Sequence, residues 1–148
     1  MNNTIIESLR IVVKSGLVFI VLFYPIGIVH ETGHYLIGYS SGSQCIFDLV
    51  LEVTCSPLLQ QDLLYFSFGG ILGMITSSAL LVIKKLRKTN WIFIGIVTTV
   101  FDQLVKSLFE TLANQAYLSL AGLAYMLVLV GSFFLVMVII YPKTHRTT

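Results

Sequence analysis

Long apolar runs constrain this chain more than any other feature of its sequence. A helix needs roughly 20 consecutive apolar residues to cross a bilayer core, and such runs lie at about 11–39, 63–83, 91–112 and 118–141. Apolar residues make up 56% of the chain and charged residues only 11%, and the mean hydropathy is +0.90, far outside the usage of soluble globular domains. The sequence therefore predicts an all-α, multi-pass integral membrane protein with about four transmembrane helices in a single transmembrane domain over residues 1–148.

A polar, glycine-containing segment from Ser40 to Gln61 separates the first two runs. Between Ile46 and Thr54, β-branched and aromatic residues partly alternate with polar ones, a pattern typical of strands. We expect a short strand or hairpin here, which either only connects the two helices or pairs with an extended peptide by strand addition. Cys45 and Cys55 lie in the same loop, where a disulfide is allowed but not required.

Basic residues are unevenly distributed over the ends of the runs. Lysine and arginine precede the first run, follow the last, and form the cluster KKLRK at 84–88, whereas the loop between the first two runs carries only acidic charges. Lysine and arginine accumulate on the cytoplasmic side of membrane proteins, so we predict cytoplasmic N- and C-termini and an extracytoplasmic loop with the two cysteines. The net charge of +2 is too small to indicate a nucleic-acid partner, and the expected surroundings are membrane lipid.

Small and hydroxyl-bearing residues interrupt the apolar runs. Small residues at the spacing that lets membrane helices approach closely are Gly69, Gly70, Gly73 and Ser77. Hydroxyl-bearing residues in the second and third runs include Thr76, Ser77, Ser78, Thr98 and Thr99. These hydroxyls either line a polar cavity that admits water or bond the backbone of their own helix, as serine and threonine commonly do.

The motif His-Glu-x-x-His at residues 30–34 places costly polar groups inside the first apolar run. On a helix, residues four apart project on nearly the same face, about 6 Å apart along the axis, so His30 and His34 can both aim a ring nitrogen at one metal ion. Glu31 flanks that face and can take a proton from water, as in zinc hydrolases with this spacing. Ionisable residues within a membrane span indicate function, and we predict a metal site with Glu31 as its base.

A zinc site of this kind needs a third protein ligand. Asp102 in the third run is the first choice, because an isolated carboxylate at that depth must find a cation. Glu110, two turns further outward, is the alternative third ligand, and it is preferred if neither a tilt nor a kink at Pro25 brings the histidines to the depth of Asp102. A competing hypothesis is that Asp102, Lys106 and Glu110 form an ion-pair strip at i, i+4 spacing.

Two segments resemble a known family. HETGHYLIGYSSG at 30–42 is similar to the His-Glu-x-Gly-His signature of the site-2 protease family of intramembrane zinc metalloproteases. FGGILGMITSS at 68–78 resembles the glycine-rich second motif of the compact branch of that family, which lacks a PDZ domain. The resemblance covers about the first 80 residues.

This resemblance implies the parts of an enzyme. Zn²⁺ would be held by His30, His34 and an aspartate on a later helix, for which Asp102 is the one aspartate within the apolar runs, and Glu31 would be the catalytic base. The implied substrate is a transmembrane protein segment, cut within the bilayer after local unwinding exposes its peptide bonds.

A second hypothesis belongs to a different class of protein. The chain would be a non-catalytic small subunit of a larger membrane protein complex, with partner subunits and a structural or vestigial metal site. Glu31 favours the enzyme, because a structural site needs the histidines but no base. A metal or proton transporter fits less well, since short spans without paired broken helices lack the repeat architecture of such carriers.

Overall fold

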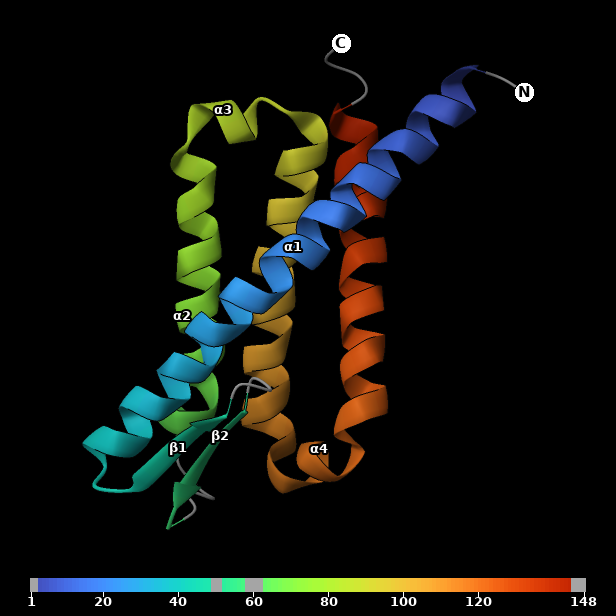
Figure 1. The fold of residues 1–148 in the computed structure, drawn as a ribbon. Helices are drawn as coiled ribbons and strands as arrows, with labels where there is room; N and C mark the ends of the chain where they lie inside the picture. Colours follow the sequence, from blue (N-terminus) through green and yellow to red (C-terminus); the bar gives the residue numbers. More distant parts are fainter. Residues whose placement is uncertain (1–2, 49–51, 58–62, 145–148) are drawn as a thin grey trace.

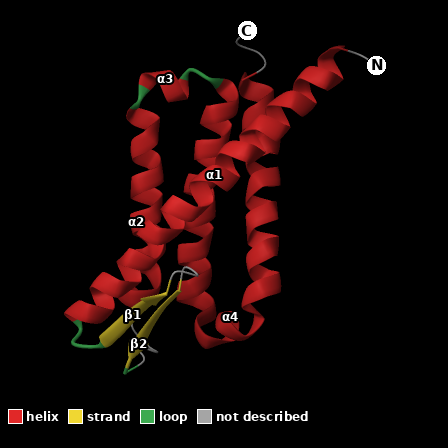
Figure 2. Ribbon diagram, viewed as in Figure 1, coloured by secondary structure: helices red, strands yellow, loops and turns green. Residues whose placement is uncertain are grey.

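The computed structural model describes the backbone of residues 3–48, 52–57 and 63–144, but not the side chains of residues 3–5 and only some of those beyond residue 111. Its elements in chain order are α1 (Asn3–Ser40), β1 (Gln44–Asp48), β2 (Glu52–Ser56), α2 (Leu63–Ala79), the 3-10 turn η1 (Leu80–Val82), α3 (Lys84–Arg87) and α4 (Asn90–Thr144). Helices dominate, and the two strands form one sheet (Figure 2). The predicted helical fold with a hairpin between the first two long helices is therefore confirmed.

Helices of membrane-spanning length occur where the apolar runs predict them. Within the described residues, the segments long and apolar enough to cross a membrane are Ile6–Ser40, Leu63–Val82 and Asn90–Thr111. They match the predicted runs at 11–39, 63–83 and 91–112 to within a few residues at each end. The first begins earlier than predicted because α1 is already helical at Asn3 and continues without a break.

One stripe of α1 faces the rest of the molecule. The helix continues through Pro25 and crosses the other long helices diagonally (Figure 1). The side chains on α1 that are most fully buried are Ser15, Phe19, Ile26, His30 and His34. Their spacing of four or seven residues defines a single helix face, so the two histidines of the motif continue the packing stripe of α1 rather than facing outward.

The helix α4 covers both the third and the fourth predicted runs. Two runs joined by a turn were expected, whereas helical structure extends from Asn90 to Thr144, and Figure 1 shows α4 doubling back on itself at one end of the molecule. The contacts of α1 agree with this shape, because Val18 is next to Gly95 and Phe19 stacks on Phe133. A straight helix would separate positions 95 and 133 by about 57 Å, so the two parts of α4 must lie side by side.

The hairpin packs against the end of α1 and the start of α2. Its register places Cys45 opposite Cys55, and the two are joined in a disulfide, which resolves the alternatives that their spacing left open. Gly38 makes room for this bridge, since a side chain there would overlap both sulfur atoms. The hairpin is therefore fixed beside the C-terminal part of α1, next to the motif.

Small residues on α2 allow the close helix approach that their spacing predicts. A Cβ added at Gly33 of α1 would lie only 2.8 Å from the Cα of Gly69. A Cβ at Gly70 would overlap Ser107 of α4, and one at Gly73 would overlap the side chain of Gln103. The glycines thus bring α1 and α4 close to α2 at the level of the motif.

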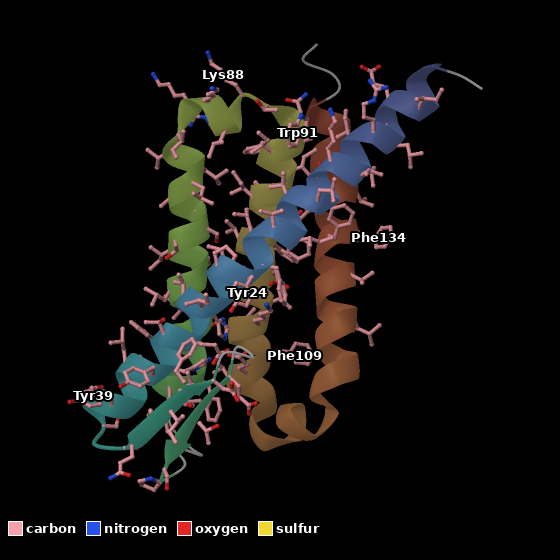
Figure 3. All side chains as sticks on the ribbon, in the orientation of Figure 1. Tyr24, Tyr39, Lys88, Trp91, Phe109 and Phe134 are labelled. Carbon is pink, nitrogen blue, oxygen red and sulfur yellow. A yellow bond between two sulfur atoms is a disulfide. The ribbon has the colours of Figure 1, made fainter. Side chains whose placement is uncertain are left out.

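The two ends of the molecule differ in their side chains. The N- and C-termini and α3 lie at one end, and the hairpin lies at the other (Figure 1). Lys88 and Trp91 are at the end with the termini, and Tyr39 is at the hairpin end (Figure 3). All four basic residues of 84–88 are exposed, so positive charge gathers at the end opposite the hairpin.

Candidate metal centre

Two imidazole rings meet in the interior between the long helices. His30 and His34 are 4% and 7% exposed, and their Nε2 atoms lie 3.0 Å apart. One helical turn separates the two residues on α1, so the helix itself sets this pairing. Together with Glu31 they form a group whose ligand atoms all lie within 4.8 Å of one another and could hold a metal ion.

The outer nitrogen of each ring is held by an acceptor. His34 Nδ1 lies 2.7 Å from the backbone oxygen of Tyr65, and His30 Nδ1 lies 2.9 Å from Gln103 Oε1. A carbonyl oxygen can only accept, so each Nδ1 carries the proton and donates it. With both Nδ1 positions protonated, the two Nε2 atoms present lone pairs to each other, and either a metal ion or a proton between them satisfies this arrangement.

A carboxylate from α4 closes the cluster. Glu110 Oε1 lies 3.2 Å from His30 Nε2, and Glu110 Oε2 lies 3.3 Å from His34 Nε2. Oε2 is also a buried atom without a hydrogen-bond partner in the described part of the chain. A buried carboxylate oxygen left in this state is costly, and a metal ion held between Glu110 and the two imidazoles would satisfy it.

Glu31 lies beside the cluster and is tied to the hairpin. Its Oε2 accepts a hydrogen bond of 3.1 Å from the backbone N–H of Val53 in β2. In the register of the hairpin, Val53 is two residues from the disulfide-bonded Cys55, and Cys45 and Cys55 have a short Cα separation of 4.1 Å typical of a non-hydrogen-bonded pair. The N–H of Val53 therefore points away from β1, which leaves it free to meet the Glu31 carboxylate.

Asp102 occupies a different position from Glu110. Its Oδ2 lies 2.9 Å from Lys106 Nζ, one turn further along α4, and 3.3 Å from Gln103 Nε2. Gln103 in turn contacts Nδ1 of His30, on the side of the ring away from the cluster. Of the two carboxylates considered as third ligand, the structure thus brings Glu110 to the Nε2 atoms and joins Asp102 to Lys106, one half of the proposed ion-pair strip.

Sequence reasoning missed Gln103 and the backbone oxygen of Tyr65. Gln103 offered a signal, because it is an amide next to an aspartate within an apolar run. Tyr65 offered none, since any residue carries a carbonyl group.

The hydroxyls considered as cavity lining bond to their own helices where the structure describes their bonds. Ser77 Oγ donates to Gly73 O, Thr98 Oγ1 to Ile94 O, and Thr99 Oγ1 to Gly95 O. Their ordinary role in membrane helices accounts for these residues.

Comparison of the chain with protein-family models, with curated proteins and with solved structures finds no match. Function is therefore inferred from the side chains of this cluster and from the helices that carry them. The donors are two buried imidazoles and a carboxylate, with a second carboxylate alongside, and catalytic metal ions in hydrolases use donors of these kinds.

Proposed function

We propose that this chain is an intramembrane zinc metallopeptidase that cleaves a transmembrane protein segment. His30, His34 and Glu110 hold the zinc ion, and Glu31 is the catalytic base. The long apolar helices cross the membrane, with both termini in the cytoplasm. Resemblance of the motif and of the glycine-rich segment to the site-2 protease family supports the same reaction class.

One observation carries this proposal, the spacing of the three donors. Ligand atoms about 2.05 Å from a tetrahedral zinc ion are about 3.3 Å from each other. The Nε2 atoms are 3.0 Å apart, and the oxygens of Glu110 lie 3.2 and 3.3 Å from them. Each of these separations is close to the spacing of zinc ligands, and binding through the two histidines and one oxygen of Glu110 would leave the fourth position open, as in catalytic zinc sites.

Bound zinc supplies a Lewis acid that polarises a peptide carbonyl and activates water. The chain supplies the remaining functions. Glu31 accepts the proton of the attacking water at its carboxylate and returns it to the leaving amide nitrogen. Oε2 of Glu31 accepts the hydrogen bond from Val53 N–H, and the other carboxylate oxygen remains able to accept the proton, so the hairpin contact can orient the base.

Metal analysis tests the site directly. We expect elemental mass spectrometry of the detergent-purified protein to find about one zinc per chain, and the His34→Ala variant to lose it. His145, the third histidine of the chain, gives the matched control, since His145→Ala should keep the metal. Folded wild-type protein without zinc would overturn the proposal and would mean that protons fill the space between these donors.

A non-catalytic subunit with a structural metal site is the competing function, and the bond between Glu31 and Val53 favours it, because a glutamate used only to fix the hairpin would need no catalytic role. The Glu31→Gln variant separates the two. An enzyme should keep its zinc and lose all cleavage of tagged transmembrane segments incubated with it in membranes. A protein that cleaves no segment in the wild-type form, yet holds its zinc, would be the structural subunit.

A further inference from the structure

A buried chain of polar contacts leads from one histidine of the cluster to an ion pair. His30 Nδ1 contacts Gln103 Oε1 at 2.9 Å, Gln103 Nε2 contacts Asp102 Oδ2 at 3.3 Å, and Asp102 Oδ2 contacts Lys106 Nζ at 2.9 Å. The exposed fractions of Gln103, Asp102 and Lys106 are 2%, 1% and 4%. Burying three such groups among apolar helices costs free energy of folding, so their presence is not explained by stability of the fold alone.

The orientation of the Gln103 amide group decides which ring nitrogen of His30 carries the proton and which has the lone pair. With Oε1 toward the ring, Nδ1 must carry the proton, and the lone pair is on Nε2, where the cluster converges. If the amide were reversed, its NH₂ group would face Nδ1. His30 would then carry its proton on Nε2, in the position that a metal ion needs.

Asp102 favours one of these two directions. A carboxylate oxygen only accepts hydrogen bonds, so it attracts Gln103 Nε2 and would repel Oε1 in the reversed amide. Lys106 balances the charge of Asp102, and its Nζ also lies 4.9 Å from the ring centre of Phe23 on α1. The ion pair is therefore held in place from two helices.

We propose that Gln103 is a positioning residue for the metal centre, which fixes the tautomer and ring orientation of His30, and that the Asp102–Lys106 pair fixes the direction of its amide. The proposal rests on the proposed zinc site. Asp102 is then not a metal ligand, as considered from the sequence, but is connected to the ligand His30 through two hydrogen bonds, by way of Gln103. Gly73 leaves the space that the Gln103 side chain occupies, because a Cβ there would come within 2.9 Å of Gln103 Cδ.

Replacement of Gln103 tests this role through two measurements. Zinc affinity is measured by competition with a chromogenic chelator, and the tautomer of His30 by nitrogen NMR of chelator-treated protein with labelled histidine. We expect Gln103→Leu to weaken zinc binding about 10–100-fold, the usual cost of losing an outer partner of a ligand histidine, and to give His30 a mixture of tautomers. The double variant Gln103→Glu/Asp102→Asn keeps an acceptor for Nδ1 without setting two carboxylates against each other, and it should restore both readouts.

A control and a second variant keep the test decisive. Thr98→Val alters a buried residue of α4 whose hydroxyl donates to Ile94 O of its own helix, and it should change neither readout. If Gln103→Leu does not fold, the double variant Asp102→Asn/Lys106→Met frees the amide without leaving a lone charge, and it should also mix the tautomers of His30.

Wild-type zinc affinity and a single His30 tautomer in folded Gln103→Leu would overturn the inference while the zinc site stands. Absence of zinc from the wild type would instead overturn the proposed function, and the NMR measurement would still decide the role of Gln103.

Discussion

The Glu110 carboxylate contacts both imidazoles, which makes it a direct test of the ligand set. Glu110→Gln removes the negative charge and leaves the side-chain shape almost unchanged. We expect its zinc affinity to fall by more than the roughly 10–100-fold that loss of an outer partner costs, because a ligand itself is lost. The measurement is chelator competition, with Glu52→Gln at an exposed position of β2 as the matched control. Equal affinities for both variants would exclude Glu110 as a ligand.

The choice between Glu110 and Asp102 shows where residue-level prediction ends. The spacing of His30, Glu31 and His34 predicts their common face, because both histidines lie on one helix and one helix has a fixed pitch. The third donor comes from another helix. Asp102 and Glu110 are two turns apart on α4. The angle at which α1 crosses α4 decides which of them meets the histidines, and side-chain packing sets that angle. The sequence could therefore name both candidates but could not choose between them.

Lys106 and Asp102 form a buried pair whose halves depend on each other. Lys106→Met leaves the Asp102 carboxylate buried and uncompensated, and we expect it to destabilise the protein by about 3–5 kcal/mol. Asp102→Asn/Lys106→Met removes both charges, so most of that loss should be recovered. Thermal unfolding in detergent, followed by the helical circular dichroism signal, measures both variants. A double variant less stable than Lys106→Met would show that the pair is not the source of the loss.

At the scale of elements, the contact between α1 and α2 holds the histidines in place. A Cβ at position 69 would lie 2.8 Å from both the His30 carbonyl oxygen and His34 Cδ2, so Gly69→Ala must push α1 away from α2. We expect it to lose zinc although every ligand is retained. Gly131→Ala on α4 is the matched control, because no described atom lies within 4 Å of a Cβ there. Full zinc binding by Gly69→Ala would mean that this helix contact does not position the site.

Elements with local signals were predictable, and those that depend on distant contacts were not. The hairpin follows from alternation within a few residues, and the long helices follow from apolar runs. The division between the third and fourth runs was harder, because residues 113–117 contain neither glycine nor proline and nothing in them ends a helix. Helical structure accordingly continues through this segment in α4, and the parts before and after the reversal of direction both contact α1.

At the scale of the whole molecule, the uneven charge predicts how the chain lies in its membrane. The basic residues of 84–88 are at the end with both termini, and the disulfide-bonded hairpin is at the other. The positive-inside rule puts the first end in the cytoplasm, and a disulfide persists on the opposite side. We expect a membrane-impermeant maleimide to label Ser41→Cys in intact cells and to label Thr89→Cys only after the membrane is opened. The native cysteines are paired, so the wild type gives the background.

Together with the position of the cluster along α1, this predicted orientation indicates which half of the membrane contains the reaction. His34 is six residues from the end of α1 at Ser40, which is about 9 Å along a helix, so the cluster lies close to the hairpin end of the molecule. Water would reach Glu31 from that side, where Val53 of the hairpin already contacts its carboxylate. A substrate should therefore be cut in the outer half of its membrane segment, and mass spectrometry of the products would locate the cut. A cut in the cytoplasmic half, or labelling of Thr89→Cys in intact cells, would reverse the orientation and move the entry of water to the other face.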